Sequence, residues 1–225
     1  MDQQQLDIGK TIVNGVAFDP KNYERRASTG LAAMDLNALY ASVGRLFDLF
    51  EEREINGVLV GGIAMLAYIE GRNTQDIDLI VQRSDLAKIP ELEVEDQTPD
   101  FARTHLDDLQ VDLLFTTNKL FALVADQFTT QKPLVNRQVA CATEEGLLLL
   151  KLFALPSLYR QGNFARVRLY EGDIASLLAE RSEPIGSLLE HLRPSLSESD
   201  FAEIEAIVSQ IQRQLSEAKD RFRQR

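Results

Sequence analysis

Two aspartates separated by a single residue, Asp76 and Asp78, stand in an otherwise apolar run that ends at Val81. The isoleucine, leucine and valine around them predict a β-strand. Side chains alternate across a strand, so both carboxylates point to the same face. Neighbouring carboxylates repel each other unless a cation joins them, and magnesium in proteins is commonly held by one or two carboxylates. The pair therefore predicts a metal site; the alternative is a strand with two solvent-exposed acids.

A glycine pair, Gly61 and Gly62, precedes this strand. It follows the apolar residues 58–60 and leads into Ile63–Ala67, which predicts a strand, a tight turn and a short helix that ends by Gly71. Backbone can approach a ligand closely at glycine, and the N–H groups at a helix N-terminus attract phosphate. The spacing fits neither a dinucleotide-binding glycine motif nor a P-loop. The glycines either bind phosphate or only form the turn.

Together, the two pairs resemble the polymerase-β-like nucleotidyltransferase superfamily. The family pattern is an apolar residue, Gly, Gly or Ser, a spacer, and then Asp-apolar-Asp. This sequence has Val-Gly-Gly at 60–62, thirteen further residues, and Asp-Ile-Asp at 76–78. With Arg72 and Thr74 ahead of the aspartates, the motif is most similar to the AbiE-type abortive-infection toxins and their uncharacterised relatives.

The resemblance implies an α/β (α+β) fold, in which a small mixed sheet flanked by helices is followed by a helical C-terminal region. It also implies transfer of a nucleoside monophosphate from a nucleoside triphosphate (NTP) to an acceptor, with Asp76 and Asp78 holding two magnesium ions. The acceptor stays open between RNA, including tRNA, a protein, and a small molecule of the aminoglycoside type. An inactive relative that only binds ligands is a further alternative. A toxin would also have an antitoxin protein as a partner.

A third carboxylate, Asp112, lies among apolar residues in the predicted strand 109–115. A buried carboxylate needs a partner, which is either a neighbouring backbone N–H or a metal ion. In the superfamily a third catalytic aspartate comes from such a strand, and Asp112 matches it. The resemblance therefore adds Asp112 to the catalytic and metal-binding set.

Three further residues are candidates for nucleotide binding besides the glycine pair. Arg72 and Thr74 precede the acidic strand, where they either contact a phosphate or tie down the loop; an arginine can also neutralise the acids when metal is absent. Lys151 has only apolar neighbours at helical spacing, so it either extends to the surface or needs an anion. Relatives carry a lysine in a similar helix, where it faces the nucleotide.

A local basic stretch follows Lys151: Arg160, Arg166 and Arg168 occur without an acid as far as Leu169. It either guides phosphates or an RNA backbone, or is a solvated loop paired with acids elsewhere. The formal net charge of −11 disfavours broad, non-specific nucleic-acid binding but leaves room for a local basic site.

The chain organisation predicts a 1–34 extension, a 35–131 core and a mostly helical 132–225 region. The extension either forms a small hairpin around Asn14-Gly15 or is mobile or partner-bound. The expected strands are 58–60, 76–81, 101–106, 109–115, 133–135 and 137–142, and 93–100 is expected to be a loop. The expected helices are about 35–53, 84–92, 118–128, 144–159, 170–181, 185–192 and 200–222.

The composition is that of a globular protein, with 44% hydrophobic and 26% charged residues. The single cysteine, Cys141, is expected in the core and fits a reducing cytosol. The N-terminus is too polar for a signal peptide, and the most apolar run, Gly146–Pro156, is too short to span a membrane. We therefore expect a cytoplasmic protein without a membrane partner. Neither His105 nor His191 lies in a motif, so no histidine-based site is supported.

Overall fold

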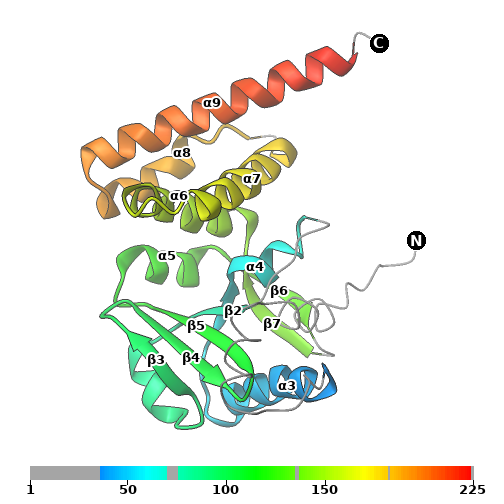
Figure 1. The fold of residues 1–225 in the computed structure, drawn as a ribbon, viewed down its shortest axis with the longest axis vertical. Helices are drawn as coiled ribbons and strands as arrows, with labels where there is room; N and C mark the ends of the chain where they lie inside the picture. The colour runs from blue at the N-terminus through cyan, green and yellow to red at the C-terminus, as the bar shows by residue number, and fades with distance from the viewer. Residues whose placement is uncertain (1–35, 70–75, 135–136, 182, 224–225) are drawn as a thin grey trace. The chain divides into compact units, whose positions relative to one another are not determined.

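A computed structural model describes residues 36–69, 76–134, 137–181 and 183–223 (Figure 1). The chain divides into two compact units, of which the first ends at Thr143 and the second begins at Glu144. The first contains a seven-stranded mixed sheet with helices, and the second is helical, as the sequence predicted for the fold class. The hairpin expected around Asn14-Gly15 lies outside the described residues.

The sheet has the strand order β3-β4-β5-β2-β1-β7-β6. Its strands are β1 (Val58–Val60), β2 (Asp76–Val81), β3 (Glu93–Gln97), β4 (Phe101–Leu106), β5 (Leu109–Phe115), β6 (Thr129–Leu134) and β7 (Arg137–Ala142). Two neighbouring pairs, β2–β5 and β1–β7, are parallel, and the other pairs are antiparallel. The strands that carry the aspartate pair and Asp112 are therefore direct neighbours near the middle of the sheet.

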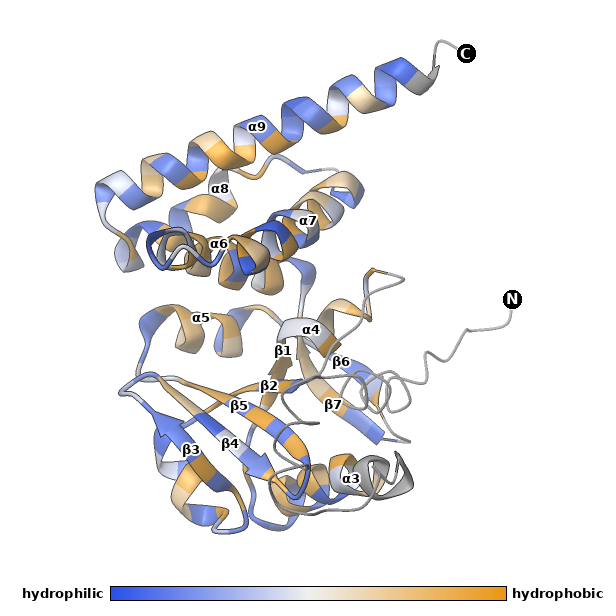
Figure 2. Cartoon of the chain, viewed as in Figure 1, coloured by the Kyte–Doolittle hydropathy of each residue, from blue (hydrophilic) through white to orange (hydrophobic). Residues whose placement is uncertain are grey.

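Helices lie on both faces of this sheet, which explains why its central strands are so apolar (Figures 1 and 2). Helix α3 (Leu36–Glu52) lies on one side, where Phe50 and Leu79 both flank the Gly57 backbone. Helices α4 (Gly61–Met65) and α5 (Lys119–Gln127) lie on the other side. A short 3-10 helix, η1 (Arg83–Lys88), follows β2.

Strand β3 contradicts the loop expected at 93–100. All five of its residues are exposed, so it lacks the apolar alternation by which a half-buried strand is recognised. Its backbone nevertheless pairs with β4. Acidic side chains along such an edge strand discourage pairing with another chain. At the opposite edge, β6 contains Pro133, whose missing N–H is tolerated at an edge.

The first unit extends beyond residue 131 because β6 and β7 complete the sheet. Strand β7 pairs with β1, with Leu59 opposite Cys141. Cys141 is fully buried, and this burial raises the pKa of its thiol to about 12. The lone cysteine is thus a core residue of the sheet.

The second unit consists of α6 (Glu144–Arg160), α7 (Phe164–Glu180), α8 (Gly186–Leu189), a 3-10 helix η2 (Glu190–Ser195) and α9 (Glu198–Arg223). Its core includes Leu148, Leu152 and Leu155 of α6. Helix α7 begins at Phe164 rather than near residue 170, because Asn163 caps it by accepting a hydrogen bond from the Arg166 N–H. None of the helices in the described ranges has the length and apolar composition needed to cross a membrane.

Candidate active site

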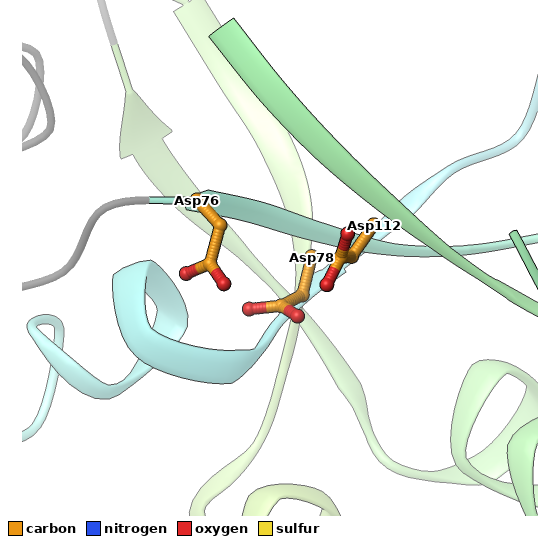
Figure 3. A group of neighbouring side chains, drawn as sticks. All are labelled: Asp76, Asp78 and Asp112. Carbon is orange, nitrogen blue, oxygen red and sulfur yellow. The ribbon is translucent and has the colours of Figure 1, made fainter. Parts of the chain in front are cut away.

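The pairing of β2 with β5 brings the predicted acids together. Asp78 is the direct partner of Asp112 in this parallel ladder, so their side chains share one face of the sheet. Asp76 lies two residues before Asp78 and points the same way. Each of the three carboxylates offers an oxygen, and these oxygens lie within 4.8 Å of one another (Figure 3). Asp76, Asp78 and Asp112 are called the acid triad below.

Burial differs across the acid triad. Asp112 is 2% exposed, whereas Asp76 and Asp78 are half-buried. Oxygen ligands at this separation suit a hard divalent cation such as magnesium. A cation could reach the acid triad from the side of Asp76 and Asp78, because these two carboxylates are only half-buried. Whether the acid triad binds metal stays a prediction.

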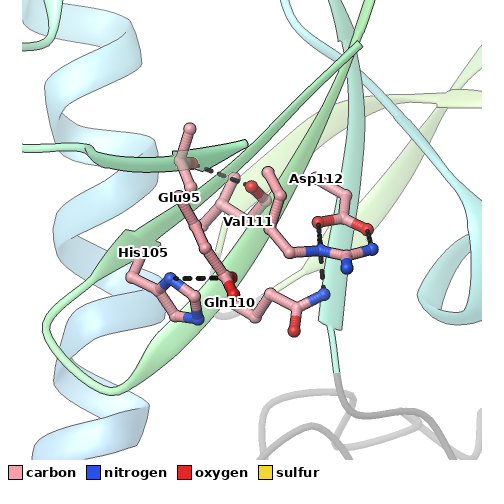
Figure 4. Close-up of polar contacts among 7 residues, drawn as sticks. Glu95, His105, Gln110, Val111 and Asp112 are labelled. Carbon is pink, nitrogen blue, oxygen red and sulfur yellow. Dashed lines mark hydrogen bonds and ion pairs between the residues drawn. The ribbon is translucent and has the colours of Figure 1, made fainter. Parts of the chain in front are cut away.

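Arg103 supplies a cation to the buried member of the acid triad. It lies opposite Asp112 across the antiparallel β4–β5 pair, and its Nε and Nη2 each donate to an Asp112 oxygen at 3.1 Å. Gln110 donates to the same carboxylate at 3.1 Å (Figure 4). The bidentate bond to Asp112 is the main reason why the pKa of Arg103 is raised. The guanidinium would therefore compete with a metal ion for the Asp112 carboxylate.

Arg103 was not predicted from the sequence, although a signal for it was present. Two strands joined by a two-residue turn at 107–108 have a fixed register, in which Leu106 faces Leu109. Counting back from that pair places Arg103 opposite Asp112. An arginine facing a buried carboxylate is then the simplest partner for it.

The glycine turn shapes the surroundings of Asp78. Val60 pairs with Asp78, so the turn that follows β1 lies against this carboxylate. Gly61 has φ +66°, and a Cβ at this position would lie 1.8 Å from Asp78 Oδ2. The Gly62 N–H donates to the same oxygen at 3.4 Å. The helix begins at Gly61 itself and is a single short turn. The glycine pair thus positions Asp78, while its contact with phosphate stays a prediction.

Lys151 of α6 has its counter-ion within the second unit. Its Nζ lies 2.6 Å from Asp173 Oδ2 and 4.3 Å from the centre of the Tyr170 ring, both on α7. The side chains of Lys151 and Asp173 are 5% and 8% exposed. The lysine is therefore buried in an ion pair rather than extended to solvent. Asp173 was missed as its partner, although a lysine in an apolar helix requires an anion nearby.

The remaining predicted residues, Arg72 and Thr74, lie outside the described part of the chain. Their proposed contacts with a nucleotide stay predictions.

No protein-family model and no curated protein sequence matches the chain. A solved structure of an antigenic nucleotidyltransferase-like protein from Paracoccidioides brasiliensis matches with a TM-score of 0.51 and 17% sequence identity. The match covers 79% of this chain and 88% of that one. The chain has a nucleotidyltransferase-like fold. At such low identity, the likeness shows the fold and nothing further.

Two structures of the antibiotic-resistance factor ANT(2'')-Ia are also similar. The solution structure is 13% identical with a TM-score of 0.45, covering 82% of this chain and 97% of that chain. The crystal structure in complex with adenylyl-2''-tobramycin is 12% identical with a TM-score of 0.43, covering 76% and 95%. The comparisons do not show the AbiE-type likeness that the sequence suggested.

Proposed function

We propose that the protein is a metal-dependent nucleotidyltransferase, which transfers a nucleoside monophosphate from an NTP to an acceptor and releases pyrophosphate. The observation that carries this proposal is the acid triad, whose oxygens lie within 4.8 Å of one another beside a glycine turn. The fold supports it as well. The alternative, a strand with two solvent-exposed acids that have no function, does not explain why a buried third carboxylate, Asp112, pairs directly with Asp78.

In this proposal Asp76 and Asp78 hold two magnesium ions, and Asp112 completes the second site when Arg103 releases it. When bound, two magnesium ions would stabilise the charge of the triphosphate and make the acceptor hydroxyl more acidic. The carboxylate oxygens of the acid triad are the type of ligand that magnesium prefers. Asp112 is also proposed to accept the proton of the acceptor.

The other residues bind and orient the triphosphate. Gly61 and Gly62 are proposed to contact the triphosphate through their backbone, because a backbone can approach a ligand closely at glycine. Arg72, Thr74 and Lys151 are proposed as further phosphate contacts. For Lys151, this role requires the lysine to share its charge between Asp173 and the nucleotide.

RNA, including tRNA, is the proposed acceptor, and the junction of α6 and α7 supports it. Arg166 and Arg168 are exposed in α7, and Phe164 is 61% exposed beside them. Arginines neutralise backbone phosphates, and an exposed ring offers a stacking surface for a base. A protein acceptor and an aminoglycoside-type acceptor are the alternatives. A toxin role would add an antitoxin protein as a partner.

The acceptor can be identified by label transfer. The full chain is incubated with magnesium, each α-labelled NTP in turn, and either total RNA, total cell protein or an aminoglycoside mixture. We expect label in the RNA fraction, no label with Asp78→Asn, and unchanged labelling with Asp96→Asn, which alters an exposed acid on β3. Tight binding of NTP with no label in any fraction would instead identify an inactive binding module.

A further inference from the structure

A pocket of about 580 Å³ opens in the first unit, apart from the residues of the acid triad. It is formed by the start of β1, the ends of β2 and β5 with the residues that follow them, and one face of α5. Its lining consists of Asn56, Val58, Ile80, Gln82, Arg83, Ser84, Thr116, Thr117, Ala122, Ala125 and Asp126. This set is called the β2-end pocket below. Its volume lies within the range of about 300–1,000 Å³ that is usual for small-molecule sites.

The β2-end pocket lies on the same face of the sheet as the acid triad. Residues two apart on a strand share a face, so Ile80 points the same way as Asp78. The neighbouring strand agrees, because Val58 pairs with Ile80 and Val60 pairs with Asp78. One two-residue step along β2 is roughly 6.6 Å. A molecule with one end at Asp78 would therefore need to extend only a few ångströms along β2 to reach the pocket.

The lining excludes a second metal or phosphate site. It contains one carboxylate, Asp126, and one guanidinium, Arg83, so its formal charges cancel. The guanidinium is already engaged, because its Nη1 donates to the Pro99 carbonyl at 3.3 Å and it lies 6.0 Å from the centre of the Phe115 ring. A divalent cation or a phosphate group would need more charge of one sign than this pocket offers.

The same lining fits a neutral, flat molecule that forms hydrogen bonds. Val58 and Ile80 provide an apolar floor, and α5 adds the methyl groups of Ala122 and Ala125 beside the carboxylate of Asp126. The amides of Asn56 and Gln82 carry both donors and acceptors, as the edges of nucleobases do. Within the described residues, these two amides make no hydrogen bond to another protein group, so both are available to a ligand.

We infer that the β2-end pocket holds the base and ribose of the NTP, while the triphosphate lies along β2 toward Asp78 and Gly61. This inference rests on the proposed function. The nucleoside is covalently joined to the phosphates that are proposed to lie at the acid triad, so it must lie close to them on the same face of the sheet. The acceptor is under no such constraint, because only its reacting hydroxyl has to reach the acid triad. Asn56 and Gln82 are the residues that select the base.

The test compares two ligands that differ only in the nucleoside. Affinities are measured by calorimetry, with magnesium, for a non-hydrolysable analogue of each NTP and for inorganic tripolyphosphate. The Ala125→Phe variant narrows the pocket, and Gln82→Ala removes an exposed amide with little risk to folding. Ala87→Phe is the matched control, since Ala87 is exposed on η1 and does not line the pocket. Thermal melting verifies that each variant is folded.

We expect Ala125→Phe to weaken the best-bound NTP analogue about tenfold or more and to leave tripolyphosphate affinity within about twofold. Gln82→Ala should reduce the preference among the four bases, and Ala87→Phe should change neither affinity. Unchanged analogue binding in Ala125→Phe and Gln82→Ala would overturn the pocket assignment and leave the proposed function standing. An equal loss of tripolyphosphate affinity in Ala125→Phe would overturn it too. A wild-type protein that binds neither ligand would contradict the proposed function itself.

Discussion

At the scale of single residues, the glycine turn positions Asp78. The Gly62 N–H donates to its carboxylate, and Gly61 has no side chain that would displace it. Asp112 lies beside Asp78 on the neighbouring strand β5, so two carboxylates face the same place before any ligand arrives. Preorganisation of this kind reduces the cost of assembling a metal site.

Replacing Asp78 with asparagine should abolish nucleotidyl transfer and weaken Mn²⁺ binding. In metal-free buffer the variant should be as stable as the wild type or more stable, because one of three clustered negative charges is removed. Thermal melting in EDTA and calorimetric Mn²⁺ titration measure the two effects. A large fall in melting temperature would show that Asp78 has a structural role instead.

Gly61→Ala should damage the site through a direct clash. Gly61 has φ +66°, and the new Cβ would lie 1.8 Å from Asp78 Oδ2. Gly162→Ala is a matched control, since Gly162 has the same φ but nothing within 4 Å of the added carbon. Both variants should lose about 1–2 kcal/mol of unfolding free energy to the backbone conformation. Only Gly61→Ala should also lose Mn²⁺ affinity, and equal Mn²⁺ affinities in the two would refute the clash.

Arg103→Gln should bind Mn²⁺ more tightly than the wild type and should be less stable without metal. The guanidinium occupies both oxygens of Asp112, so it competes with an ion for that ligand. Removing it also leaves a buried carboxylate without its cation. Arg45→Gln is the control, because Arg45 pairs with the exposed Asp107 on the same hairpin. Weaker Mn²⁺ binding in Arg103→Gln would mean that Arg103 positions Asp112 rather than competing for it.

At the scale of elements, the central strands could be predicted because their residues are apolar. β2 and β5 have the bounds expected from sequence, and alternation along β2 placed both aspartates on one face. β3 and the start of α7 could not be predicted, because exposed elements carry no apolar periodicity: β3 is wholly exposed, and only Val167 is buried among residues 164–169. Their backbone partners are visible only in the folded chain.

The candidate site shows the same division between local and long-range information. The two aspartates of β2 and the glycine pair lie close in sequence, so their motif was recognisable. Arg103 could have been found from the hairpin register, which is local as well. The side-by-side placement of Asp78 and Asp112 depends on the parallel pairing of β2 with β5, which no short segment specifies. Only the resemblance to a family pointed to it.

The α6–α7 pair yields a prediction about Lys151. Lys151→Met leaves Asp173 buried without its cation, and breaking a buried ion pair typically costs about 3–5 kcal/mol. The Lys151→Met/Asp173→Leu double variant removes both charges and should recover most of that loss. Denaturant unfolding of both variants measures this. A single variant that is as stable as the wild type would show that the pair contributes nothing to the second unit.

At the scale of the whole molecule, the net charge of −11 opposes the binding of any polyanion. The acid triad adds negative charge where the triphosphate is proposed to lie. NTP binding should therefore depend strictly on a divalent cation, which offsets both sets of charges. Of the basic stretch in the second unit, Arg166 and Arg168 are exposed on α7, whereas Arg160 pairs with Asp200 at 2.6 Å.

The central claim is tested most directly by following the two ends of the NTP. The full chain is incubated with magnesium, total RNA and one NTP labelled either on its α- or on its γ-phosphate. We predict that the α-label enters an acceptor, that the γ-label leaves in pyrophosphate in equal amount, and that Asp76→Asn and Asp78→Asn each abolish both. Transfer of the γ-label to an acceptor, or release of γ-labelled inorganic phosphate without acceptor labelling, would contradict nucleotidyl transfer.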